Sequence, residues 1–168
     1  MKRTMAEGVR TASVPAASTA ATMERELPSE PAGKPRLFVA GRARLLKLTR
    51  QVDERGALVP LAFADLGFPV ARAFAVTAPG GTVRGGHGHR RSRQLLMRIR
   101  GVIRVELRTP SGTDIVDLDE ETPALLIEPG VWANQTYLGD DAALVVFSDI
   151  AYDPDDYIHQ VEPLEAGE

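Results

Sequence analysis

The chain has 168 residues, 43% of them hydrophobic, which is enough for one globular domain with an extension but not for two full domains. The formal net charge is −3 and the basic residues are dispersed, so the sequence gives no indication of a nucleic-acid-binding surface. The absence of cysteine excludes disulfides, thiolate catalysis and cysteine metal sites, and no apolar run is long enough to span a bilayer. A cytoplasmic protein is therefore expected.

The first 34 residues are rich in Ala, Ser, Thr, Glu and Pro and almost lack large apolar side chains. Such a segment cannot bury enough surface to offset the entropy lost on ordering. We therefore expect a disordered N-terminal extension over residues 1–34, followed by one domain over residues 35–168.

Beyond residue 35, short apolar segments recur at roughly 8–12-residue spacing between Gly and Pro turns, the pattern of an antiparallel sandwich or barrel. No segment of ten or more residues keeps a helical period of 3.6. Gly101 is expected to form a tight connection between two strands. The predicted strands cover residues 43–52, 57–62, 70–77, 94–100, 102–107, 114–118, 123–128 and 142–147. The predicted fold class is all-β.

Two of the three histidines, His87 and His89, lie two residues apart in a segment that holds four glycines between positions 81 and 88. On a strand this spacing puts both imidazoles on one face. The glycines permit a sharp bend or the close approach of a ligand. A His-x-His pair in a β protein also fits two merely structural or exposed histidines, but the glycines, Arg84 and the amide of Gln94 favour a site.

The spacing from Gly81 through the histidines and Gln94 to Gly101 resembles the first motif of the cupin superfamily, and residues 128–133 resemble the second. Cupins are double-stranded β-helices, jelly-roll barrels that bind metals or sugars. Metal-binding cupins have a glutamate at the position of Gln94 and a histidine at the position of Ala133. Without these anionic and imidazole ligands we expect no metal site, and a metal-dependent cupin is the least favoured function.

At a finer level, Arg84-Gly-Gly-His87-Gly-His89-Arg90 resembles the Arg-Gly-x-His-Ala-His-Lys signature of the WxcM-like, FdtA-type family of nucleotide-sugar 3,4-ketoisomerases. The other matching motifs, in order within residues 45–160, are Asp53-x-Arg55-Gly56-x-Leu58, Gln94, Pro129-x-x-Trp132 and residues 148–158. The resemblance implies a cupin jelly roll, a homodimer, no metal or other cofactor, and a dTDP-4-keto-6-deoxyhexose substrate.

The chain departs from this family at Ala133, where histidine usually follows the tryptophan, and at Phe74 and Ala75, which replace tyrosines after the matching Arg72. These changes remove polar groups from the expected pocket. They leave open a different substrate or product stereochemistry, and also a nucleotide-sugar-binding cupin without activity.

Moving a ketone from C4 to C3 of a sugar requires removal of the C3 proton, an enediol, and protonation at C4, with no net oxidation. An imidazole that titrates near neutrality suits this work. We predict His87 as the base and His89 as its acid/base partner, and the reverse assignment stays open. Arg84 remains protonated and is expected to stabilise the enediolate or bind a phosphate. Gln94 is expected to bind a sugar hydroxyl or to fix a histidine tautomer.

Three further residues are expected to contact substrate. Arg72 matches the family. Trp132 could stack on a thymine or sugar ring, although a tryptophan is more often part of the core. Arg98 shares a strand face with Gln94 by the period of two, with an exposed charge or an ion pair as the alternatives.

Three expectations concern the surface. Leu95, Met97 and Ile99 are predicted to form a dimer surface, unless a second sheet of the same chain covers them. His159 is expected to be solvated. The acidic run Asp153–Asp156 is expected to be a solvated face or a dimer contact.

Overall fold

The computed structural model describes residues 36–161, so the extension expected over residues 1–34 lies outside the described part of the chain. The described residues form β-strands and three short 3-10 helices, η1 (Val39–Gly41), η2 (Phe63–Leu66) and η3 (Pro154–Asp156). The predicted all-β class is confirmed. Within the same residues no helix has the length and apolar character needed to cross a membrane.

Nine strands form one curled antiparallel sheet, and two more form a separate hairpin. The strands are β1 (Leu37–Phe38), β2 (Ala43–Leu46), β3 (Gln51–Asp53), β4 (Gly56–Leu58), β5 (Arg72–Thr77), β6 (Val83–His89), β7 (Gln94–Thr109), β8 (Gly112–Leu118), β9 (Ala124–Ile127), β10 (Trp132–Ser148) and β11 (Tyr157–Ile158).

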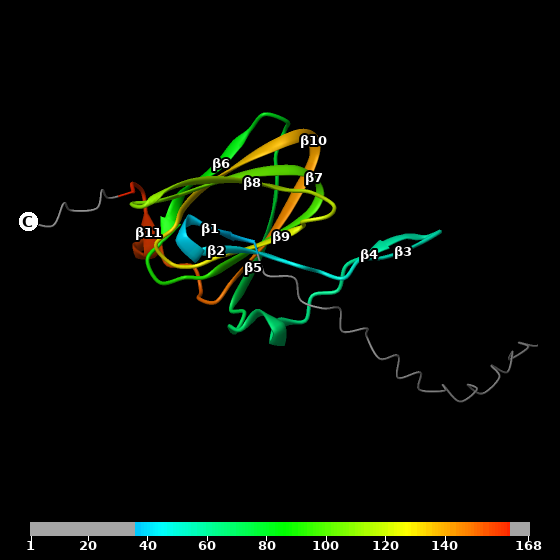
Figure 1. Ribbon diagram of the computed structural model, residues 1–168, viewed down its shortest axis with the longest axis horizontal. Helices are drawn as coiled ribbons and strands as arrows, with labels where there is room; N and C mark the ends of the chain where they lie inside the picture. The colour runs from blue at the N-terminus through cyan, green and yellow to red at the C-terminus, as the bar shows by residue number, and fades with distance from the viewer. Residues whose placement is uncertain (1–35, 162–168) are drawn as a thin grey trace, which may run out of the picture. The chain divides into compact units, whose positions relative to one another are not determined.

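The two longest strands, β7 with 16 residues and β10 with 17, organise the sheet because each changes neighbours along its length. The first part of β7 pairs with β9 and the second with β8, while the first part of β10 pairs with β6 and the second with β5. The sheet therefore curls into two facing halves (Figure 1), the arrangement of a cupin jelly roll.

Gly101 does not end a strand, contrary to the sequence-based prediction. It lies inside β7 with φ +68°, and a Cβ at this position would lie 2.6 Å from Cα of Ala142 on β10. The register between β7 and β10 shifts here, between Leu138 and Ala143. Glycine thus allows the two strands to bend together at close range. A bend and a turn leave the same local sequence pattern, and only the long-range pairing with β10 distinguishes them.

The strand predicted over residues 43–52 is interrupted, since β2 ends at Leu46 and Gln51 begins the hairpin β3–β4. The strand predicted over residues 57–62 shrinks to β4, because Pro60 has no N–H for a ladder hydrogen bond. Among the described residues this hairpin pairs with no other strand. Val52 and Leu58 are exposed on it.

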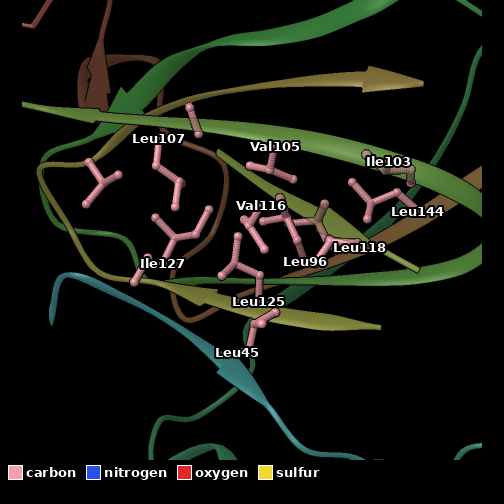
Figure 2. Packing of buried hydrophobic residues seen from close by; sticks show 14 of the residues in the cluster. Leu45, Leu96, Ile103, Val105, Leu107, Val116, Leu118, Leu125, Ile127 and Leu144 are labelled. Atoms are coloured by element: carbon pink, nitrogen blue, oxygen red, sulfur yellow. The ribbon is translucent and has the colours of Figure 1, made fainter. Parts of the chain in front are cut away.

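The main core fills the interior of the curled sheet. Figure 2 shows Leu107, Val105, Leu96 and Leu125 pointing toward one another from β7 and β9. Each fully buried side chain of this kind contributes roughly 1.5–3 kcal/mol through the apolar area it removes from water. The open end of this interior, beyond the apolar cluster, is where the polar side chains of the site gather.

A second, smaller cluster packs on the other face of β7 and β9. It includes Leu66 and Phe68, which cover Leu95. Met97 is also buried, whereas 54% of Ile99 is exposed. The same chain therefore covers two of the three residues that were expected to face a partner.

Candidate functional site

The histidine pair is positioned by a bulge in β6. Gly85 and Gly86 both have left-handed backbone angles, φ +82° and +74°, and β6 has one extra residue opposite the step from Ala133 to Asn134 of β10. Glycine adopts this conformation without the strain that a side chain would add. The bulge carries the carbonyl of Gly85, which accepts a hydrogen bond from Nδ1 of His87 at 3.1 Å. The backbone shape thus fixes the first imidazole.

His87 and His89 lie on the same face of β6, as the spacing predicts. Their ring centroids are 5.2 Å apart and the ring planes meet at 81°. Tyr157, on the neighbouring strand β11, pairs with His89 in the ladder. The centroid of its ring lies 4.5 Å from that of His87 and 5.0 Å from that of His89. The three rings form one compact cluster.

Both ring nitrogens of His89 have partners. Nδ1 lies 3.0 Å from Oδ2 of Asp156, and Nε2 lies 2.8 Å from the amide nitrogen of Gln94. Because a carboxylate only accepts and an amide N–H only donates, Nδ1 carries the proton and Nε2 accepts. This contact fits one of the two roles expected for Gln94, that of fixing a histidine tautomer.

The surroundings of the two imidazoles differ in charge. Burial lowers the pKa of His87, the carbonyl of Gly85 opposes this, and the charges of His89 and His159 lower it further. Burial also lowers the pKa of His89, but here the carboxylate of Asp156 opposes the effect. The lowered pKa values favour the neutral form of both rings. Among the described residues, His89 contacts a carboxylate that can stabilise its protonated form, whereas His87 contacts none.

Asp156 contacts the histidine pair, which the sequence reasoning missed, since it predicts a solvated face or a dimer contact for the run Asp153–Asp156. Its side chain is 2% exposed. Oδ1 accepts a hydrogen bond from the backbone N–H of Arg91 at 2.8 Å, and its carbonyl accepts one from the N–H of Arg90 at 2.8 Å. Burial raises the pKa of Asp156, but the hydrogen bonds from Arg91 and His89 outweigh it and leave the pKa lowered.

His159 is exposed, as expected, yet it belongs to the same cluster. Because Tyr157 pairs with His89 and Ile158 with Gly88, the next residue of the chain lies beside His87. The ring of His159 is nearly parallel to that of Tyr157, at 9°, with centroids 6.1 Å apart. All three histidines of the chain thus meet at one edge of the sheet. No short-range pattern in the sequence predicts this.

Arg72 provides a cation next to the histidines. Its guanidinium lies 5.0 Å from the ring centroid of Phe74 and 5.5 Å from that of Tyr152, which is 64% exposed. Its Nε is buried without a hydrogen-bond partner among the described residues, and its charge reaches His89. This arrangement suits an anionic group of a ligand.

Phe74 and Ala75, the two residues of β5 that replace tyrosines usual in the family, face different sides of the sheet. Arg72 and Phe74 lie on one face, while Ala75 alternates to the other. Only Phe74 therefore changes the polarity of the side that holds Arg72.

Arg84 lies beyond the bulge, opposite Gln135 in the ladder, and is exposed. Within residues 36–161 it has no hydrogen-bond or ion-pair partner, and its charge reaches the buried Tyr137. It is on the same sheet face as the histidines and is available to a ligand, although it contacts neither ring.

Trp132 is not brought to the site. It pairs with Gly88 and with Arg108, so it points to the face opposite that of His87. Its ring centroid lies 4.7 Å from the guanidinium of Arg108. The register of β10 thus places the tryptophan on the sheet face opposite that of the two histidines.

Arg98 is also remote. Four residues of a strand separate it from Gln94, which corresponds to about 13 Å. Its Nε donates a hydrogen bond to the carbonyl of Gly101 at 2.6 Å. It lines a different cavity, of about 540 Å³, together with Arg50 and Glu120. Arg98 and Gln94 do share a strand face, as predicted. The side chain of Arg98 binds the backbone at the bend around Gly101 and does not reach the histidines.

The space enclosed beside the histidines is small. A cavity of about 20 Å³ is lined by His87, His89, Gln94, Ala133 and Gln135 among others, which is room for about one water molecule. A larger ligand must therefore bind from the open side of the sheet. No group of three or more His, Cys, Asp or Glu within residues 36–161 is arranged to hold a metal ion.

The curled antiparallel sheet with two histidines on β6 defines a cupin-type protein with a polar site at one end of the barrel. The family described as "FdtA: WxcM-like, C-terminal" matches residues 42–165, and the chain belongs to this family.

Individual relatives agree with this assignment. The chain is 26% identical over 121 residues to the TDP-4-oxo-6-deoxy-alpha-D-glucose-3,4-oxoisomerase of Aneurinibacillus thermoaerophilus, covering 71% of this chain and 87% of the relative. The crystal structure of QdtA, a sugar 3,4-ketoisomerase from Thermoanaerobacterium thermosaccharolyticum in complex with TDP, is similar with a TM-score of 0.66 at 27% identity, covering 71% and 88% of the two chains. The rmlC epimerase of Mycobacterium tuberculosis, at 17% identity and a TM-score of 0.65 over 74% and 72%, shares the fold.

Proposed function

We propose that the protein is a sugar-nucleotide isomerase that moves the keto group between C4 and C3 of a dTDP-4-keto-6-deoxyhexose. The observation that carries this proposal is the pair of imidazoles that lie 5.2 Å apart on one sheet face, one of them bound to the carboxylate of Asp156. Membership of the family and the TDP-sugar 3,4-isomerases among its relatives support the substrate class.

The reaction is a balanced transfer of protons. A base removes the proton from C3, the C–H electrons form the C3–C4 double bond, and O4 receives a proton to give the enediol. O3 then loses its proton as the C3 ketone forms, and C4 receives a proton from an acid/base group that exchanges protons with the solvent. No electron leaves the sugar, so no redox cofactor is required.

In this scheme His87 is the base, because its Nδ1 is held by Gly85 and its Nε2 has no partner among the described residues. His89 serves the sugar oxygens, since Asp156 can stabilise its protonated form. Positioned acid/base groups of this kind contribute about 10²–10⁴ in rate. When the sugar binds, one of its hydroxyl groups replaces the amide of Gln94 as the hydrogen-bond partner of Nε2 of His89.

Arg72 and Arg84 each interact with a different negative charge of the substrate. Arg72, held between Phe74 and Tyr152, binds the diphosphate. Arg84 stabilises the negative charge that develops at the enediolate. A homodimer, independence from metal and a location in the cytoplasm stay predictions of the sequence.

A second function has a specific observation in its favour. Ala133 lies opposite His87 in the ladder, and Phe74 replaces a tyrosine usual in the family, so two polar groups are missing from the site. A protein that binds the nucleotide sugar without converting it would tolerate both losses.

One assay separates the two functions. Purified full-length protein is incubated with dTDP-4-keto-6-deoxyglucose in D₂O, the product is followed by NMR, and binding is measured by calorimetry. The proposal predicts a 3-keto product with deuterium at the exchanging carbon. Binding without conversion would establish the second function, and the absence of binding would overturn both.

A further inference from the structure

Asp156 is held by hydrogen bonds to both oxygens of its carboxylate and to its backbone carbonyl. Its Oδ1 accepts the backbone N–H of Arg91, its Oδ2 accepts Nδ1–H of His89, and its own carbonyl accepts the N–H of Arg90. The side chain is almost completely buried, at 2% exposure. A buried carboxylate is costly unless its oxygens are satisfied, and each oxygen here has a different partner. Both side-chain oxygens of Asp156 therefore face hydrogen-bond donors.

We infer that Asp156 is a positioning residue that holds His89 in its Nδ1–H tautomer and thereby keeps Nε2 of His89 directed at Gln94 and the substrate. The inference deepens the proposed function and rests on it for its catalytic consequence. The hydrogen-bond geometry on which it depends is independent of any activity.

The directionality of the hydrogen bonds carries the argument. The N–H of Arg91 can only donate, so the oxygen that faces it must remain an acceptor. The other oxygen faces Nδ1 of His89, and only an acceptor there leaves the proton on Nδ1. Nε2 is then unprotonated, which agrees with the amide donor of Gln94 at 2.8 Å. One carboxylate thus sets the state of a ring nitrogen on the far side of the imidazole.

Asp156 also ties the segment around η3 to β6, so a purely structural role has to be distinguished. Asp153 supplies the matched control. It lies on the same segment, is paired with Arg91, and accepts the N–H of Asp155 at 2.9 Å, but it does not touch an imidazole. Asp153→Asn and Asp156→Asn remove the same charge from the same loop.

Asp156→Asn keeps the shape of the side chain. Its carbonyl oxygen stays with Arg91, and its NH₂ group then faces Nδ1 of His89. The proton of His89 must move to Nε2, where it opposes the donor of Gln94. Turnover should fall about 10²–10⁴-fold, the usual worth of a positioned acid/base group, while KM changes little. Asp153→Asn should leave both values near those of the unmodified protein.

The decisive readout is ¹⁵N NMR of the histidine side chains, since it needs no substrate. The inference predicts an Nδ1–H tautomer for His89 in the unmodified protein and in Asp153→Asn, and an Nε2–H tautomer in Asp156→Asn. An Nε2–H tautomer in the unmodified protein, or an unchanged tautomer in folded Asp156→Asn, would overturn it. The first measurement holds even if Asp156→Asn does not fold. An unmodified protein with the expected tautomer but no isomerase activity would refute the proposed function alone.

Discussion

Ala133 lies directly opposite His87 in the ladder between β10 and β6, and both side chains line the same small cavity. A histidine at position 133 would add a third imidazole to the face that holds His87 and His89. The two positions at which the sequence departs from the pattern of metal-binding cupins, 94 and 133, thus lie beside both histidines.

The first prediction concerns metal. Activity of the unmodified protein should survive extensive chelation, while the double variant Gln94→Glu with Ala133→His should gain stoichiometric binding of Ni²⁺ or Fe²⁺, since it completes a set of three imidazoles and one carboxylate. Metal analysis and calorimetry measure both. Adding His87→Asn should abolish the gain. Loss of activity together with a stoichiometric metal on chelation would contradict the prediction.

The second prediction concerns proton transfer. His87→Asn and His89→Asn keep a polar side chain but remove the titrating ring, so turnover should fall about 10²–10⁴-fold. Binding of dTDP should stay within roughly tenfold, because each change removes at most one hydrogen bond to the ligand. Solvent deuterium should no longer enter the sugar in His87→Asn. Unchanged single-turnover rates in both folded variants would show that neither histidine transfers the proton.

The third prediction concerns pH and stability. Burial lowers the pKa of both His87 and His89 below 6.5 in the folded state. Between the folded and the unfolded pKa values the unfolded chain binds more protons than the folded chain, so the free energy of unfolding rises with pH in this window. The part of the stability that depends on the neutral histidines is therefore lost as the pH falls below about 6.5.

Urea unfolding at pH about 7.5 and about 5.5 tests this linkage. The unmodified protein should lose more stability on acidification than a variant in which both histidines are replaced by glutamine. Equal losses would show that the two rings do not contribute.

The fourth prediction compares two glycines of the bulge. Gly85→Ala and Gly86→Ala impose the same left-handed strain, about 1–2 kcal/mol. A Cβ on Gly85 would also lie 3.0 Å from the carbonyl oxygen of Ala133, whereas a Cβ on Gly86 would come no closer than 4.0 Å to the ring of Trp132. Gly85→Ala should therefore lower the melting temperature more and, by moving the carbonyl that holds His87, also reduce turnover. Indistinguishable melting temperatures would refute this.

The fifth prediction concerns the ligand anion. Arg72→Met keeps an apolar chain between Phe74 and Tyr152 but removes the charge, so calorimetry should show dTDP binding weakened about tenfold or more, as for a lost charged hydrogen bond. Trp132→Phe, on the opposite sheet face, should bind dTDP as the unmodified protein does. The reverse order of effects would place the ligand on the other face.

Sequence reasoning succeeded where the site is local. The pairing of His87 with His89 on one face follows from a period of two, and Gln94 reaches His89 from only five residues away. It failed where pairing between distant strands decides. Gly101 has the composition of a turn, yet β10 keeps β7 continuous.

The face of Trp132 and the contact of Asp156 with His89 depend on registers that no short segment encodes. Asp156 lies 67 residues beyond its histidine, in a run that composition alone makes look solvated. Carboxylates are usually exposed, but Asp156 is buried because it accepts a hydrogen bond from the imidazole of His89.

The placement of Asp156 and Tyr157 after the last long strand also has a consequence for the way the protein is made. A ribosome delivers both histidines, Gln94 and the whole of β10 before the η3–β11 segment emerges. The nascent chain can assemble its apolar interior while His89 still lacks its contacts with the carboxylate of Asp156 and the ring of Tyr157. The carboxylate that orients His89 is therefore the last part of the site to be synthesised, after all the long strands of the barrel.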